Sequence, residues 1–179
     1  MRLQLREYPE GVEIGGERLV LYDVAENSAS FGGGTAQGHA LTWELAGETD
    51  PGAKLDAPVE LDLAEGWVMR CDRVDFPPGG VAYTHTHPGP GIRCLLEGEI
   101  RIETQGHTAT YGPFEAWFER GPDPVYAAAS ESENTGFVRV MLLPQEYAGK
   151  RTIRYEDPAD DEKPKLQQAT ILLEEPLVP

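Results

Sequence analysis

The side chains most able to do chemistry in this sequence are its histidines. There are four, at positions 39, 85, 87 and 107, and two of them form the run His85-Thr86-His87. Alternate residues of a β-strand share one face, so both imidazoles would point the same way. Such a pair can ligate a transition metal together with a third protein ligand. Alternatively, the two rings act as general acid or base, or line a barrel without metal.

The elements that position these histidines are β-strands. Helical periodicity is almost absent, whereas short β-rich runs recur about every eight to twelve residues, bounded by Gly, Pro, Asn and Asp. The pattern predicts an all-β fold with strands at 18–23, 40–45, 67–76, 81–87, 92–96, 99–104, 107–111, 116–118, 125–129 and 136–143. The run at 169–173 could add an edge strand.

The segment around the histidine pair resembles the first motif of the cupin superfamily. That motif has a glycine, five residues, H-x-H, three or four residues, a glutamate, six residues and a glycine. Here Gly79 precedes His85 at the right spacing, and Gly98 closes the motif in Leu96-Glu97-Gly98-Glu99. The resemblance covers residues 67–144 and implies an antiparallel β-barrel of the jelly-roll type, a double-stranded β-helix, with a site in its mouth.

Carried over residue by residue, the resemblance is incomplete. The glutamate ligand of the family falls on Gly91, which has no side chain. Arg93, two residues on, would point to the same face and could hold a carboxylate or enolate; alternatively it pairs with one of the many carboxylates. The last histidine of the family is also missing, because strict spacing puts Pro124 in its place.

Two other residues could complete the site. Tyr126 takes the place of the last histidine if the loop is two residues longer, and a phenolate ligates hard metals. Glu119 lies in the strand that enters the same turn and would supply the missing carboxylate. The predicted metal ligands are therefore His85, His87 and Glu119, with Arg93 and Tyr126 as catalytic residues. The cofactor would be a divalent transition metal, Fe, Mn, Zn or Ni.

Several other residues are expected to have structural rather than chemical roles. His39 and His107 are expected on the surface, and Cys71 and Cys94 as buried thiols. The Gly-rich segment 28–38 follows no clear strand and opens no helix, so it is expected to be a flexible loop rather than a phosphate cradle. Of Trp117 and Phe118, one should face the cavity and the other a neighbouring sheet or subunit.

Composition excludes several partner classes. The 15 Lys and Arg against 31 Asp and Glu leave a net charge of −16, which disfavours nucleic acid and anionic membrane surfaces. No apolar run is long enough to span a bilayer, and residues 1–9 lack the apolar core of a signal peptide, so we expect a cytoplasmic protein. Residues 81–96 contain no acid, which suggests an anionic or metal-chelating small molecule at the site.

We expect one structural domain, with an N-terminal extension of extra strands at 1–66, a barrel core at 67–144 and a C-terminal arm at 145–179. Both faces of 92–96 and 138–143 are apolar and need cover, from a second sheet and a partner subunit, which suggests a homodimer.

Whether the protein is an enzyme stays open at this point. The resemblance favours dioxygenase-like cleavage of a small carboxylate, carbonyl or aromatic substrate, followed by lyase or isomerase chemistry. The alternatives are a non-catalytic small-molecule binding or sensing barrel that has lost part of its metal site, and an adaptor that works through its surface.

Overall fold

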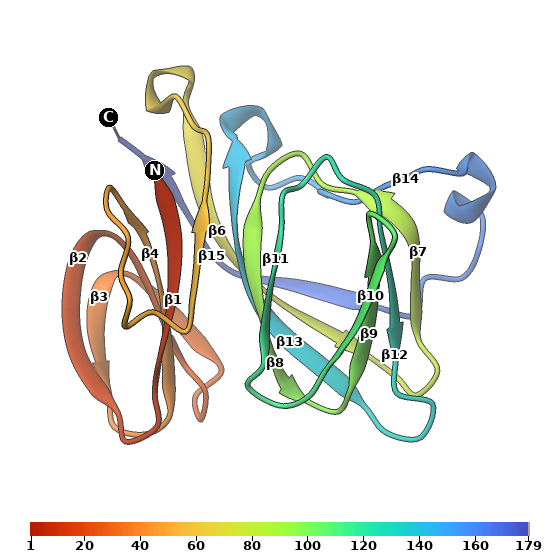
Figure 1. The fold of residues 1–179 in the computed structure, drawn as a ribbon, viewed down its shortest axis with the longest axis horizontal. Helices are drawn as coiled ribbons and strands as arrows, with labels where there is room; N and C mark the ends of the chain where they lie inside the picture. The colour runs from red at the N-terminus through yellow and green to blue at the C-terminus, as the bar shows by residue number, and fades with distance from the viewer. Residues whose placement is uncertain (179) are drawn as a thin grey trace.

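The computed structural model describes residues 1–178, and the fold is built almost entirely of antiparallel strands (Figure 1). The strands form three five-stranded sheets. Their bounds are β1 Arg2–Tyr8, β2 Val12–Asp23, β3 Ser28–Ala36, β4 Ala40–Ala46, β5 Leu55–Pro58, β6 Trp67–Phe76, β7 Val81–Thr86, β8 Gly91–Glu97, β9 Ile100–Thr104, β10 His107–Tyr111, β11 Ala116–Glu119, β12 Val125–Ala129, β13 Thr135–Pro144, β14 Arg154–Tyr155 and β15 Gln168–Leu177.

Two of the sheets form the barrel. One has the strand order β11-β8-β13-β6-β15 and is called here the shared sheet; the other has the order β10-β9-β12-β7-β14 and is called the distal sheet. Figure 1 shows them facing each other around a common interior. Residues with a common parity on each strand face this interior, because side chains alternate between the two faces of a strand. The predicted all-β barrel is therefore confirmed.

The third sheet, called the N-terminal sheet, has the order β3-β2-β4-β1-β5 and packs on the outer face of the shared sheet. The core between them joins Leu5, Leu41 and Trp43 to Ile92 and Val140. Trp43 is fully buried, and its indole Nε1 donates to the backbone oxygen of Ile92 at 3.2 Å. The shared sheet is thus covered on both faces within one chain.

This cover bears on the predicted homodimer. The apolar outer faces of β8 and β13 pack against the N-terminal sheet, and Met141 and Leu143 on the other face of β13 pack against the helical turn after it, so neither face indicates a partner subunit any longer. Dimerisation stays a prediction, as does the division of the chain at residues 66 and 144.

The predicted flexible loop at 28–38 is wrong, because most of it is strand β3, paired with β2. Gly33 has a φ of 104°, and a Cβ there would lie 2.1 Å from the oxygen of Ile14. Glycine is required where two backbones approach this closely. Strands β1, β5 and β14 were also missed: β1 is rich in charged residues, and the other two are very short.

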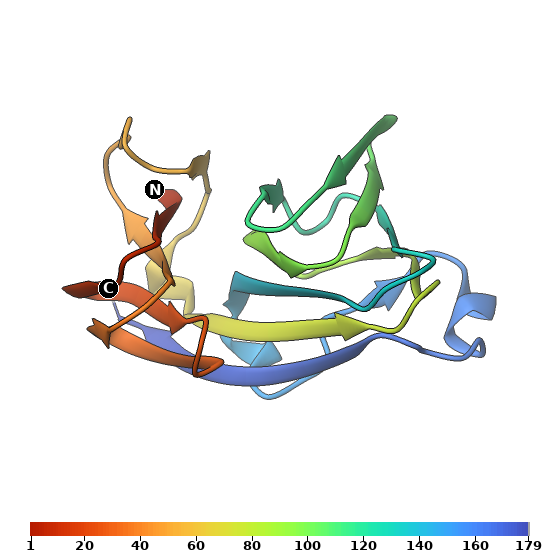
Figure 2. The ribbon, with the colours of Figure 1, turned by 90° about the horizontal axis from the view of Figure 1, so that it is seen from below.

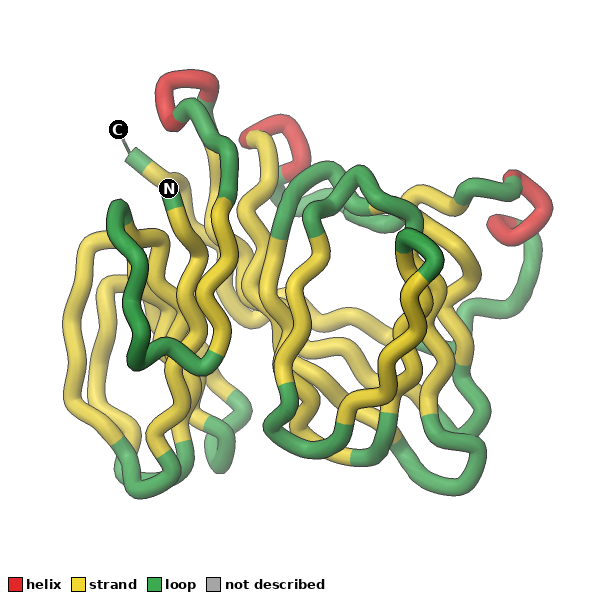
Figure 3. The backbone as a smooth tube through the Cα atoms, in the orientation of Figure 1, coloured by secondary structure: helices red, strands yellow, loops and turns green. Residues whose placement is uncertain are grey.

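The C-terminal segment ties the two halves together. Strand β15 pairs with β6 and runs from the barrel to the N-terminal sheet, where it contacts β3 (Figure 2). The predicted edge strand at 169–173 is confirmed and is longer than expected. Three short helical turns, η1 Leu63–Glu65, η2 Gln145–Tyr147 and η3 Pro158–Asp161, lie at the periphery (Figure 3). No helix among the described residues is long and apolar enough to cross a membrane.

Candidate functional site

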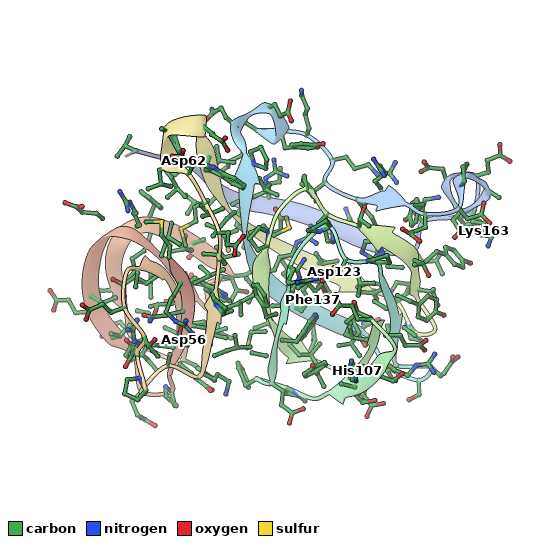
Figure 4. The ribbon with its side chains drawn as sticks, turned by 45° about the horizontal axis from the view of Figure 1, so that its top comes forward. Asp56, Asp62, His107, Asp123, Phe137 and Lys163 are labelled. Atoms are coloured by element: carbon green, nitrogen blue, oxygen red, sulfur yellow. The ribbon has the colours of Figure 1, made fainter. Side chains whose placement is uncertain are left out.

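The barrel encloses a cavity of ≈ 350 Å³ whose wall has an apolar part and a charged part. Phe137 points into the barrel interior, whereas His107 lies at its edge (Figure 4). The apolar part is formed by Val74, Phe76, Ala82, Ile102, Trp117, Val125, Ala127 and Phe137. The charged and polar part includes Arg70, Asp72, His85, His87, Arg93, Glu119 and Arg139.

Both predicted histidines face this cavity, His85 from the end of β7 and His87 from the turn after it. Their ring centroids lie 4.9 Å apart. His85 Nδ1 lies 2.6 Å from the backbone oxygen of Tyr83, and His87 Nδ1 lies 3.2 Å from that of Thr152. A carbonyl only accepts hydrogen bonds, so each Nδ1 carries the proton and each neutral ring keeps Nε2 as an acceptor.

Burial keeps these rings neutral. His85 and His87 are each 5% exposed, and desolvation is the largest cause that lowers the pKa of both. The pKa of His87 lies well below its ordinary value because the charges of Arg139 and Arg93 add to the effect of burial. The lowering is smaller for His85, where the Tyr83 carbonyl and Glu119 oppose it. The site therefore presents two proton acceptors at neutral pH.

A row of charged residues crosses the shared sheet beneath the histidines. Asp72 on β6 is the register partner of Arg139 on β13, and Arg139 is the partner of Arg93 on β8. All three are buried, with exposures of 1%, 7% and 1%. Asp72 Oδ2 accepts from Arg139 Nε at 3.1 Å and from Nη2 at 2.9 Å. Arg139 Nη1 lies 3.5 Å from His87 Nε2 and thereby joins the row to the histidines.

Glu119 on β11 neutralises part of this charge. Its Oε2 lies 2.7 Å from Arg93 Nη2, and its Oε1 accepts from the Trp117 indole at 2.8 Å. The pKa of Arg93 is lowered to about 10, mainly by desolvation; the charge of Glu119 opposes this lowering, and the charge of Arg139 adds to it. The predicted inward placement of Arg93 and Glu119 is what the structure shows, and of the pair Trp117 and Phe118 it is Trp117 that faces the cavity.

The glycine at the family's glutamate position has a structural consequence. Gly91 is the register partner of Glu119, so the Glu119 carboxylate lies directly opposite the position at which the family has its glutamate ligand. A Cβ on Gly91 would lie 3.1 Å from Arg93 Nη1, and that nitrogen donates to the Gly91 oxygen at 2.7 Å. Because glycine has no side chain, position 91 leaves room for the Arg93 side chain.

The residues present do not fit a three-ligand metal centre as they are arranged. No group of three His, Cys, Asp or Glu side chains within residues 1–178 has the geometry to hold a metal ion. Glu119 Oε2 is engaged by Arg93 and lies 4.0 Å from His87 Nε2, while the Arg139 guanidinium faces that same nitrogen. A cation at the histidines would meet two fixed positive charges.

Tyr126 does not reach the cavity, so the prediction that it acts there is corrected. Its neighbours Val125 and Ala127 line the interior, and alternation along β12 turns Tyr126 outward, where Arg101 lies 6.0 Å from its ring centroid. The strand pairing is irregular here, with Val125 opposite His85 and Ala127 opposite Ala82.

The other histidines lie apart from the site. His107 is exposed at the start of β10, as predicted. His39 is partly buried rather than on the surface: its Nε2 lies 2.8 Å from Glu7 Oε1 and its ring is 4.0 Å from that of Phe114. Cys71 and Cys94 are buried free thiols, as predicted.

Among the residues at the site that sequence reasoning missed are Asp72, Arg139 and Thr152. Asp72 is one of four charged residues of β6, so its sequence context does not distinguish it. Arg139 is the one charged residue within the apolar run of β13, and a lone charge inside such a strand signals a polar interior. Thr152 contributes only a backbone oxygen, so no sequence signal could have found it.

Comparisons with known proteins match only part of the chain. No protein-family model and no curated protein matches. Among solved structures, a protein of unknown function from Rhizobium leguminosarum bv. viciae 3841 is 28% identical over 38% of this chain and 62% of that chain, with a TM-score of 0.34. An RmlC-like cupin from Shewanella frigidimarina NCIMB 400 is 15% identical over 44% and 68%, with a TM-score of 0.39.

A third similar structure is the polyketide cyclase RemF from Streptomyces resistomycificus, 23% identical over 53% of this chain and 70% of that chain, with a TM-score of 0.41. The chain is thus similar in part to structures that include a cupin. The strand pairing forms the expected antiparallel barrel, so the predicted all-β fold is confirmed.

Proposed function

We propose that the cupin-like barrel binds a small organic carboxylate in its cavity. The observation that carries this proposal is the pair of buried arginines, Arg93 and Arg139, that stand directly opposite each other on neighbouring strands and face the cavity. Like charges directly opposite each other destabilise a sheet, and Glu119 and Asp72, each paired with one of the arginines, offset this cost in part. The fold keeps such a pair where a ligand would offset its cost.

The charge of the cavity wall supports an anionic ligand. Six cationic side chains line the cavity against two anionic ones, Asp72 and Glu119, in a chain whose net charge is −16. Arginine suits this role because its planar fork matches a carboxylate in two parallel hydrogen bonds. The wall therefore selects for an acid rather than for a neutral molecule of the same shape.

The apolar part of the wall indicates the chemical nature of the rest of the ligand. Phe76, Trp117 and Phe137 pack together there with aliphatic side chains, and the Trp117 and Phe137 rings lie 5.3 Å apart. A cavity of ≈ 350 Å³ is at the small end of the range for organic ligands. We infer a compact molecule with a hydrocarbon or aromatic body and a carboxylate head.

The histidines would give the site its chemistry. His85 and His87 offer neutral Nε2 acceptors beside the arginines, as a general base requires. With the carboxylate held by Arg93, these acceptors are placed to take a proton from the ligand, which suits lyase or isomerase chemistry. If no proton is transferred from the ligand, the same arrangement makes the protein a non-catalytic binding or sensing barrel.

A divalent transition metal on His85, His87 and Glu119, with dioxygenase-like chemistry, is the second candidate. The observation in its favour is that both Nδ1 atoms are tied to backbone carbonyls, because metal-bound histidines are oriented in this way. Such a metal site requires the Glu119 carboxylate to break its ion pair with Arg93.

The experiment compares a carboxylic acid with its neutral isostere. Isothermal titration of 3-phenylpropanoate and 3-phenylpropanamide into the protein is expected to show that the acid binds at least about tenfold more tightly, since a charged hydrogen bond contributes about 1.5–3 kcal/mol. The double variant R93Q/E119Q, which removes both charges of one pair, is expected to lose that preference, whereas Arg101→Gln on the outer surface keeps it.

Equal affinity for the acid and the amide, or no binding of either, would refute the proposal. The second candidate is tested by elemental analysis of protein purified without a metal-affinity tag. About one equivalent of metal, lost in the H85A/H87A double variant, would favour the metal centre over the arginine site.

A further inference from the structure

Two buried polar atoms in the charged part of the cavity have no hydrogen-bond partner among residues 1–178. One is Asp72 Oδ1, an acceptor: the other oxygen of this carboxylate takes both bonds from Arg139. The second is Arg93 Nη2, a donor: it lies 2.7 Å from Glu119 Oε2, but its N–H bonds do not point at that oxygen. Asp72 and Arg93 are each 1% exposed and both line the cavity.

The two atoms belong to the same end of the cavity. A chain of short distances connects them: Arg93 Nη2 to Glu119 Oε2 at 2.7 Å, Glu119 Oε2 to His87 Nε2 at 4.0 Å, and His87 Nε2 to Arg139 Nη1 at 3.5 Å. Arg139 is in turn bonded to Asp72. Asp72, Arg139 and Arg93 are also successive register partners on three neighbouring strands, and all three line the cavity, so a ligand in the cavity faces both the donor and the acceptor.

Leaving these atoms unpaired is costly. A buried polar atom without a partner loses its hydration and costs about 1–3 kcal/mol, more when it is charged. Nearly all such atoms in folded proteins have a protein, water or ligand partner. Asp72 Oδ1 and Arg93 Nη2 both lack a hydrogen-bond partner and belong to residues that line the cavity. A ligand that fills this cavity can supply a hydrogen-bond partner to each atom.

We propose that the ligand is a hydroxy acid: its carboxylate accepts from Arg93 Nη2 and its hydroxyl donates to Asp72 Oδ1. This inference rests on the proposed function and deepens it, because a simple carboxylate supplies no donor for Asp72. The hydrocarbon or aromatic body lies against Trp117 and Phe137. Asp72 thus becomes the residue that determines specificity for the hydroxyl group.

The test uses three acids of one skeleton: 3-phenyllactate, 3-phenylpropanoate, which lacks the hydroxyl, and 2-methoxy-3-phenylpropanoate, which keeps the oxygen but cannot donate. Isothermal titration is expected to show that 3-phenyllactate binds about tenfold more tightly than either of the others. In the Asp72→Asn variant, the preference for 3-phenyllactate over 3-phenylpropanoate should disappear.

The outcomes separate the two proposals. Equal affinity of all three acids for the wild-type protein overturns the hydroxy-acid inference, because Oδ1 is then served by water, and leaves the carboxylate site standing. Tight binding of the methoxy acid also overturns it, since that compound offers no donor. If none of the acids binds, both proposals fall. The wild-type comparison decides even if Asp72→Asn fails to fold.

Discussion

At the scale of single residues, the site is a set of buried charges that neutralise one another in part. Among residues 1–178, Glu119 is the anion in contact with Arg93, and Asp72 forms its ion pair with Arg139. Each charge has lost most of its hydration, so its pairing matters far more than that of a surface charge.

The first prediction concerns Glu119. Glu119→Gln should lower the free energy of unfolding by about 3 kcal/mol, because it leaves the Arg93 guanidinium buried and unpaired. Adding Arg93→Met should restore most of the loss. Urea denaturation measures both. The matched control is Glu103→Gln, whose carboxylate pairs with Arg101 on the surface and should cost less than about 1 kcal/mol. A loss in Glu119→Gln as small as the control's would contradict this account.

The second prediction concerns pH. Burial lowers the pKa of His85 and His87 in the folded protein, so the unfolded chain binds more protons once the pH falls below about 6.5. The free energy of unfolding should therefore decrease as the pH falls from about 7 to 5.5. His87→Asn, which keeps a donor for the Thr152 oxygen, should flatten this slope.

His107→Asn is the control for that measurement, because His107 is exposed. It should leave the slope unchanged. If the slope of His87→Asn equals that of the wild-type protein, His87 is not held neutral by burial.

The candidate site could be predicted in part. Spacing identified His85 and His87, strand alternation placed Arg93 in the cavity, and Glu119 was found from its place in the strand that enters the turn. Tyr126 was assigned to the cavity through an assumed longer loop, whereas alternation along β12 turns it outward. Arg139 was not predicted to belong to the site, although a single arginine in an otherwise apolar strand indicates a polar interior.

At the scale of elements, the segment between β13 and β14 matters most, since it brings the Thr152 oxygen to His87. Arg70 holds this segment from inside the barrel: it donates to the oxygens of Lys150 and Tyr147 at 2.8 and 2.7 Å, and it pairs with Glu174 on β15. The amide of Gly149 donates to the same Glu174 at 2.8 Å.

The third prediction follows from these contacts. Arg70→Met should speed amide hydrogen exchange in residues 147–153, because the carbonyls that anchor the segment lose their donor. Exchange in β9 and β10 should not change. Arg18→Met removes an exposed bond to the Val178 oxygen and serves as the control. Unchanged exchange at 147–153 in a folded Arg70→Met protein would show that Arg70 does not anchor the segment.

Most barrel strands could be predicted because hydrophobic alternation and turn residues mark both their cores and their ends. β6, β10 and β12 match the predicted bounds. β3 could not be recognised, since its glycines serve a close approach to β2 that exists only in the folded sheet. β14 has two residues and is strand only by pairing with β7.

At the scale of the whole molecule, the N-terminal sheet completes the core on the outer face of the barrel. The shared sheet presents the charged row to the cavity and apolar residues to the N-terminal sheet, so the two halves should unfold together.

The fourth prediction tests this coupling. Trp43→Ala should lower the free energy of unfolding by about 3–5 kcal/mol, because it leaves a large cavity between the sheets. Urea unfolding curves from circular dichroism and from tryptophan fluorescence should shift together. Trp67→Ala, at a partly exposed site, should cost less. In the Trp43→Ala variant the remaining Trp67 and Trp117 both lie on barrel strands. A circular-dichroism transition that shifts while their fluorescence transition does not would mean that the N-terminal sheet unfolds independently of the barrel.

The measurement that tests the central claim most directly is a high-resolution crystal structure of the protein with 3-phenyllactate. The account predicts the carboxylate within hydrogen-bond distance of Arg93 and beside Arg139, with the phenyl ring against Trp117 and Phe137. A ligand bound outside the barrel, or a carboxylate held by a metal ion on His85 and His87, would contradict it.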